Sequence, residues 1–180
     1  MSIKARKVAF LGLLSAVSVV MIILSGVFET STVFFLAIAS FCVGIAIYEY
    51  GIGTGVSVYI ACLILGFLLA PNKFYLITYS GFAIYICSIE WTYRFLEKKI
   101  ANQLKRNRIT WVLKYIYFNL IYLPILFLFP KLIMTGTLNR KLVILMVVMG
   151  QVVLYLLDRV YNSFMGYYCK ELRKRLRING

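Results

Sequence analysis

Apolar positions in this chain come in long uncharged blocks rather than in short alternating runs. Six such blocks follow one another, at residues 8–28, 30–48, 50–72, 74–89, 115–130 and 142–157. A helix needs roughly 20 mostly apolar residues to cross the hydrocarbon core of a bilayer, where a charge costs several kcal/mol. The first three blocks are long enough as they stand. The last three reach that length if each runs a turn past one charged position.

The pattern therefore predicts an all-α, polytopic membrane protein with six transmembrane helices in a single domain, residues 1–180. The predicted spans are residues 8–28, 32–48, 52–70, 74–93, 111–130 and 142–165. The Gly-rich stretch at 51–55 and Pro71-Asn72 are sequences at which helices end. Thr30 or Ser31 is suited to cap the second helix. Two longer loops are expected, a basic one at 94–110 and another at 131–140.

The basic residues form three groups, before the first span, between the fourth and fifth spans, and after the sixth. They are Lys4, Arg6 and Lys7; Arg94, Lys98, Lys99, Lys105, Arg106 and Arg108; and Lys170, Arg173, Lys174, Arg175 and Arg177. Short loops rich in Lys and Arg stay in the cytoplasm. An even number of spans puts both basic ends there. We therefore expect a multi-pass protein of the plasma membrane with cytoplasmic N- and C-termini, whose first partner is the lipid bilayer.

Composition narrows the classes of function. Of the 180 residues, 62% are hydrophobic and 14% charged, and the mean hydropathy is +0.87. Soluble domains carry about 45–50% apolar and about 25% charged residues, so a soluble enzyme, a disordered tail and a disulfide-stapled secreted domain are excluded. The net charge of +14 comes mainly from basic segments that flank the predicted spans. We interpret these segments as cytoplasmic and attracted to anionic lipid, not as a nucleic-acid site.

Residues for catalysis are scarce. There is no histidine, Asp158 is the sole aspartate, and no Gly-rich phosphate loop ends in Lys-Ser or Lys-Thr. The four cysteines (Cys42, Cys62, Cys87 and Cys169) form no C-x-x-C pair and are interpreted as packing residues. We therefore expect no enzyme activity, no cofactor and no metal site, and any energy input must come from a partner or a gradient.

Four charged residues fall inside the predicted spans: Glu90, Lys114, Asp158 and Arg159. Charges within spans suggest function by default, but all four lie toward the cytoplasmic ends. The structural interpretation pairs Lys114 with Glu90 or Asp158, and Arg159 reaches the interface through its long side chain. Both interpretations stay open.

Polar residues in the outer half suggest a binding site for a small molecule. The candidate substrate-binding residues are Glu29, Tyr75, Tyr79, Asn119, Gln151 and Tyr155. Tyrosines with a few amide and carboxylate groups fit a mostly apolar pocket. They equally fit an interfacial aromatic belt and interhelical amide hydrogen bonds.

The first span carries the small residues Gly12, Ser15 and Ala16, which allow another helix to approach closely. This span follows directly on the basic segment Lys4 to Lys7, and five more spans follow. In this combination the chain resembles the substrate-binding S components of energy-coupling-factor (ECF) transporters. The resemblance implies that the first helix docks on a transmembrane coupling subunit that works with ATPase subunits. It also implies an outward-facing cavity for a vitamin-like solute, under a first outer loop that here contains Glu29.

Two hypotheses from different classes follow. The chain is either a solute-binding subunit of an ECF-type transporter, or a non-transporting membrane scaffold of the cell envelope. For the scaffold, the 94–110 loop and the 170–180 tail would be the working surface. A cavity in the outer half favours the transporter, and a solidly packed outer half favours the scaffold.

Overall fold

The structure is a computed structural model that describes residues 3–100, 102–128, 140–168 and 170. Most of these residues are in helices: α1 (Ile3–Val27), the 3-10 turn η1 (Glu29–Ser31), α2 (Thr32–Tyr50), α3 (Ile52–Leu69), α4 (Tyr75–Lys99), α5 (Gln103–Leu128) and α6 (Arg140–Tyr167). The all-α prediction is confirmed for these residues, and each predicted span overlaps one α-helix, with residues 129–130 of the fifth outside the described part of the chain. The loop expected at 131–140 lies outside the described residues except for Arg140.

Four helices among the described residues are long and apolar enough to cross a membrane. They are Lys4–Val27, Thr32–Tyr50, Ile52–Leu69 and Leu145–Tyr167. Helix α4 is less apolar because tyrosine, serine and threonine side chains and Glu90 interrupt its hydrophobic positions. In α5 the side chains are described only as far as Pro124. The molecule is thus compatible with a membrane location.

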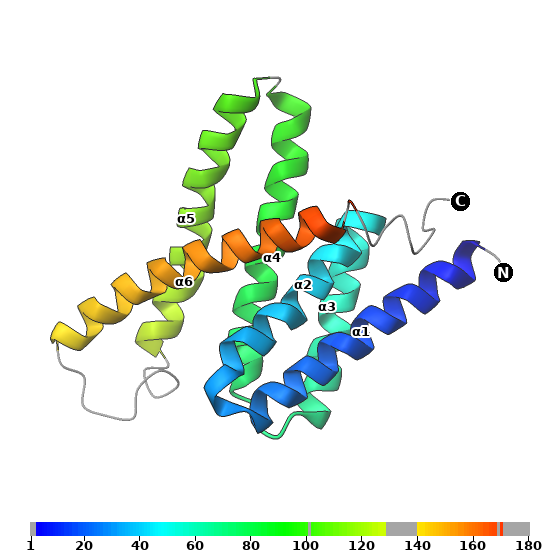
Figure 1. Ribbon diagram of the computed structural model, residues 1–180, viewed down its shortest axis with the longest axis horizontal. Coiled ribbons are helices and arrows are strands. Elements are labelled where there is room, and N and C mark those ends of the chain that lie inside the picture. The colour runs from blue at the N-terminus through cyan, green and yellow to red at the C-terminus, as the bar shows by residue number, and fades with distance from the viewer. Residues whose placement is uncertain (1–2, 101, 129–139, 169, 171–180) are drawn as a thin grey trace. The chain divides into compact units, whose positions relative to one another are not determined.

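The chain divides into two compact units, Met1–Pro124 and Ile125–Gly180. In the first unit, α2 packs against α1, α3 and α4, and α1 also packs against α3. Every residue of α2 from Ala39 to Ile47 is buried, as expected for the central helix of a bundle. The α1–α2 and α3–α4 connections lie at one end of this bundle, and the α2–α3 connection lies toward the other (Figure 1). The second unit contains α6.

The turns within the bundle follow the sequence closely. Gly51 ends α2 with φ at 94°, a conformation that favours glycine, and its amide donates to the Ile47 carbonyl at 2.8 Å. Helix α3 ends just before Pro71, and the Asn72 side chain accepts a hydrogen bond from the Phe74 amide at 3.0 Å. Both breaks are where Gly-rich and Pro-Asn sequences predicted them.

The prediction that the Thr30 or Ser31 side chain caps the start of α2 is wrong. Ser31 occupies the N-cap position but makes no capping hydrogen bond through its side chain. Instead the Thr32 hydroxyl donates to the Ser25 carbonyl at 3.0 Å, which ties α2 to the last turn of α1. The 3-10 turn brings these two residues together, a tertiary contact that a local capping rule does not include.

The prediction of a long basic loop at 94–110 is also wrong. Helix α4 continues to Lys99 and α5 begins at Gln103. Lysine, arginine, leucine and glutamine are good helix formers, and the segment has no glycine or proline to stop them. Asn102 caps α5, because its side-chain oxygen accepts hydrogen bonds from the amides of Leu104 at 3.1 Å and Lys105 at 3.4 Å. The basic segment therefore consists mainly of the C-terminal end of α4 and the N-terminal end of α5.

Candidate functional site

Helix α1 presents a small-residue face away from the bundle. Gly12 and Ala16 are exposed, and a Cβ added at Gly12 would meet nothing within 4 Å. Large apolar neighbours on the same helix, Leu13 and Val20, are 63% and 50% exposed. The predicted docking residues Gly12 and Ala16 thus lie on an open apolar surface that a second helix can approach.

Ser15 is placed differently from its two neighbours. It is half-buried, and its carbonyl accepts a contact from the Cys62 thiol of α3 at 3.8 Å. One turn later, the buried Ser18 hydroxyl donates to the Ala39 carbonyl of α2 at 3.0 Å. The serines therefore lie on the side of α1 that packs into the bundle, and the docking prediction is carried by Gly12 and Ala16.

Tyr79, a predicted substrate-binding residue, lies in the core of the first unit. It is fully buried, and its ring centroid is 6.1 Å from that of Tyr59 on α3. Its polar neighbours are Ser18 on α1 and Cys62 on α3. Cys62, like Cys42 on α2, is a buried free thiol, which agrees with the interpretation of both as packing residues. Tyr79 of α4 therefore packs against α1 and α3, and its part in substrate binding stays a prediction.

The other predicted binding residues fall on four different elements of the chain. Glu29 is in η1, and its side chain is outside the described part of the chain. Tyr75 begins α4 and is half-buried. Asn119 donates to the Tyr115 carbonyl one turn earlier in α5 at 2.8 Å. In the second unit, Gln151 and Tyr155 are one turn apart on α6. A shared outer cavity stays a prediction.

The charged residues inside the predicted spans have identifiable neighbours. Lys114 is 3% exposed, and its ammonium lies 5.4 Å from the Tyr93 ring centroid and 5.2 Å from that of Trp111. Aromatic faces attract a cation at such distances. Asp158 accepts a hydrogen bond from the Asn162 side chain at 3.0 Å, and Arg159 is exposed. The pairing of Lys114 with Glu90 or Asp158 stays a prediction.

A hydroxyl contact and a ring contact join α4 to α5. The hydroxyls of Thr92 and Tyr117 are 3.3 Å apart, and the rings of Tyr85 and Phe118 meet edge to face with centroids 6.1 Å apart. Phe118 also stacks on Tyr122 at 5.2 Å. We call residues 92–118 the α4–α5 hairpin. Its two helices are held by aromatic and polar contacts, and its tip carries exposed basic residues.

No pattern in the sequence indicates the structural role of Arg94. Its guanidinium Nη2 donates to the carbonyls of Ile47 at 2.6 Å and Tyr48 at 3.3 Å, at the C-terminal end of α2. The last carbonyls of a helix carry partial negative charge and attract cations. Arg94 therefore fixes the base of the hairpin to the bundle. In the sequence, Arg94 contributes only to the predicted membrane orientation. In the structure it also contacts residues that are distant in sequence.

Comparison with protein-family models, with curated proteins and with solved structures finds no match to this chain.

Proposed function

We propose that this protein is a membrane-embedded subunit that docks through the outward face of α1 and binds a small solute, as the S component of an ECF-type transporter. The single observation that carries the proposal is the exposure of Gly12 and Ala16 on an apolar, membrane-length helix whose other side packs into a bundle. Small residues let helix backbones approach closely in lipid, where packing drives association.

The proposal includes six membrane crossings, with both termini in the cytoplasm of a multi-pass plasma-membrane protein. The distribution of charge supports this topology. The basic start of α1 and the hairpin tip carry most of the described cations, and such segments stay in the cytoplasm. The turns at 28–31 and 70–74 would then face outward. ATP hydrolysis would belong to partner subunits, not to this chain.

Docking is tested by enlarging the small-residue face. We expect Gly12→Leu with Ala16→Leu to abolish co-purification of a transmembrane coupling subunit from membranes of a cell that also expresses ECF subunits. The matched control is Gly53→Leu, since Gly53 is also exposed with open space at its Cβ but lies on α3. The control should keep the complex. Circular dichroism and gel filtration check that each variant is folded. Equal recovery of the complex with the α1 variant would contradict docking at this face.

Solute binding is tested separately on the purified protein. Mass spectrometry of a detergent extract should find a bound small molecule, and a panel of vitamins should contain one that raises the thermal unfolding temperature. Tyr155→Phe and Asn119→Ala, at the less buried predicted binding residues, should reduce that rise. A protein that carries no solute and responds to none would contradict the solute-binding part.

The scaffold function remains a second candidate because two observations favour it. Tyr79 packs in the core of the first unit, and the hairpin tip exposes Lys98, Lys99 and Lys105 at the ends of α4 and α5. A scaffold would lose its cytoplasmic partner when these lysines become glutamine, whereas the transporter subunit would keep its coupling complex. Recovery of proteins bound to each variant separates the two functions.

A further inference from the structure

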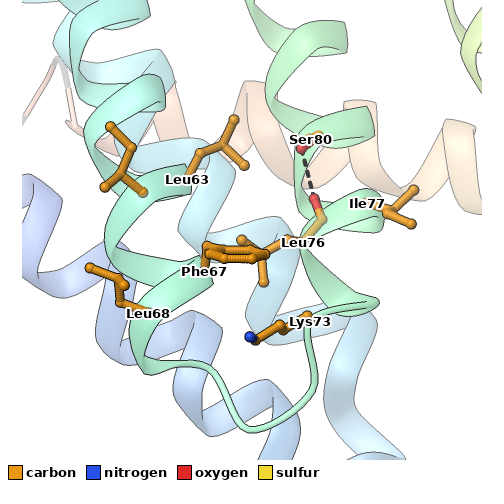
Figure 2. Close-up of a pocket in the computed structure, with 8 residues that line it drawn as sticks. Leu63, Phe67, Leu68, Lys73, Leu76, Ile77 and Ser80 are labelled. Carbon is orange, nitrogen blue, oxygen red and sulfur yellow. Dashed lines mark hydrogen bonds between the residues drawn. The ribbon is translucent and has the colours of Figure 1, made fainter.

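A hydrophobic groove runs between α3 and α4, beside the turn that joins them. Its volume is about 510 Å³, and its walls are the side chains of Leu63, Ile64, Phe67, Leu68, Leu76 and Ile77. Figure 2 shows the Phe67 ring between the two helices beside Leu76. Sites for small apolar ligands have volumes of about 300–1,000 Å³. The groove is therefore large enough to hold part of an acyl chain.

The groove has one cation at its mouth. Lys73, in the α3–α4 turn, is exposed, and its ammonium lies 4.4 Å from the Phe67 ring centroid. The other polar lining residue, Ser80, donates its hydroxyl to the Leu76 carbonyl at 2.7 Å, as the dashed line in Figure 2 shows. Among the lining side chains, the polar group open to a ligand is thus the Lys73 ammonium, a single positive charge at one end of the apolar groove.

This charge lies where a membrane would place a lipid headgroup. Helix α3 is long and apolar enough to cross a bilayer, and Lys73 follows its C-terminal end by four residues. Lysine side chains at such positions keep the ammonium at the interface while their carbon stems cover apolar surface. A molecule that fits has an acyl chain for the groove and an anionic group for Lys73.

We propose that the α3–α4 groove binds an anionic phospholipid of the surrounding membrane, with an acyl chain along α3 and α4 and the phosphate beside Lys73. Charge complementarity selects this occupant over a zwitterionic lipid. The site is distinct from the small-residue face of α1. It rests on the membrane location of the chain and not on docking or solute binding.

The bundle supplies a matched control at its opposite end. There the ammonium of Lys7 lies 5.0 Å from the Tyr50 ring centroid, a lysine–aromatic pair similar to that of Lys73 and Phe67. Lys7 is not among the residues that line the groove. Loss of either lysine removes one charge from the protein, so a difference between Lys73→Gln and Lys7→Gln reports on the groove.

The test uses the full chain, delipidated in detergent and titrated with phosphatidylglycerol or phosphatidylcholine of the same acyl chains, with bound lipid counted by native mass spectrometry. One basic residue near an anionic headgroup is worth about 1 kcal/mol, or about fivefold in affinity. We expect wild type to bind phosphatidylglycerol about fivefold more tightly than phosphatidylcholine. Lys73→Gln should remove this preference and Lys7→Gln should keep it.

A second pair of variants tests the apolar part of the site. Ile64 lines the groove and is 58% exposed, and Ile60, one turn earlier on α3, is 49% exposed and is not a lining residue. Ile64→Trp should fill the groove and weaken binding of both lipids, and Ile60→Trp should leave binding unchanged.

Three results would overturn the proposal. The first is a preference for phosphatidylglycerol that survives Lys73→Gln, or that falls equally with Lys7→Gln. The second is displacement of the lipid by glycerol 3-phosphate at equal concentration, which would show that a soluble anion is recognised. The third is a dimer mass that excludes lipid, which would show that a second copy of the chain covers the groove. None of them bears on docking at α1.

Discussion

The α1–α4 bundle and the α4–α5 hairpin are held together by different kinds of side chain. In the bundle, Gly55 of α3 lies directly against Ile47 of α2, and the Ser18 hydroxyl reaches the α2 backbone. In the hairpin, the Thr92 hydroxyl contacts that of Tyr117, and just below it the Phe118 ring meets the Tyr85 ring of α4. Helices surrounded by lipid gain little from the hydrophobic effect and associate by close packing. The hairpin resembles the aromatic and basic boundary of a membrane protein.

The close packing of the bundle predicts that the largest loss of stability comes from adding a side chain at Gly55. A Cβ at Gly55 would overlap the Ile47 side chain close to its backbone, so Gly55→Leu forces α2 and α3 apart. We expect a loss of stability of about 2–3 kcal/mol or more, measured by chemical unfolding in detergent. Gly53→Leu, two residues earlier with open space at its Cβ, should stabilise slightly or change little. Equal losses at both positions would show that the bundle does not depend on close approach at Gly55.

The connection between the two regions should be of intermediate strength. Arg94→Gln removes a charged donor from the Ile47 and Tyr48 carbonyls at the end of α2. A partly exposed hydrogen bond to a charged group at a helix C-terminus is worth about 1–2 kcal/mol. The same unfolding experiment should detect this loss, and Arg108→Gln, at an exposed position in the first turns of α5, provides the reference. If the two variants unfold alike, Arg94 does not fix the hairpin to the bundle.

The smallest effect is expected inside the hairpin. The Thr92 hydroxyl donates to the Ser88 carbonyl at 2.8 Å, and since it has one proton, Tyr117 is the donor in their contact. Tyr117→Phe removes that donor and should cost about 0.5–1 kcal/mol. Tyr115 lies on the same helix and is 41% exposed, so Tyr115→Phe should cost less stability. An equal or larger loss for Tyr115→Phe would show that the Tyr117 hydroxyl makes no particular contribution to the stability of the hairpin.

Much of the fold was predictable because charge, glycine and proline mark where membrane-length helices end. Gly51 and Pro71 each end a helix at the expected place. The sequence predicts a loop for the basic segment at 94–110 because its charges do not belong in lipid. A charged segment can leave the lipid and still be helical. Here α4 and α5 continue as helices beyond their apolar parts.

The candidate site was less predictable because its residues depend on contacts distant in sequence. Gly12 and Ala16 were identified together and lie on one open face, as their four-residue spacing on a helix requires. Tyr79 carries the same polar group as an interfacial tyrosine, and only the packing of α1 and α3 around it shows that it is in the core. The groove at Phe67 and Lys73 forms across a turn, so no periodic pattern within one helix reveals it.

Cysteine accessibility tests the proposed topology most directly. In a variant whose four native cysteines are replaced by serine or alanine, single cysteines at residues 30, 72, 102 and 180 are exposed to a membrane-impermeant maleimide in intact cells. The account predicts that Thr30→Cys and Asn72→Cys react in intact cells, while Asn102→Cys and Gly180→Cys react only after permeabilisation. Reaction of Asn102→Cys or Gly180→Cys in intact cells would contradict six crossings with both basic ends in the cytoplasm.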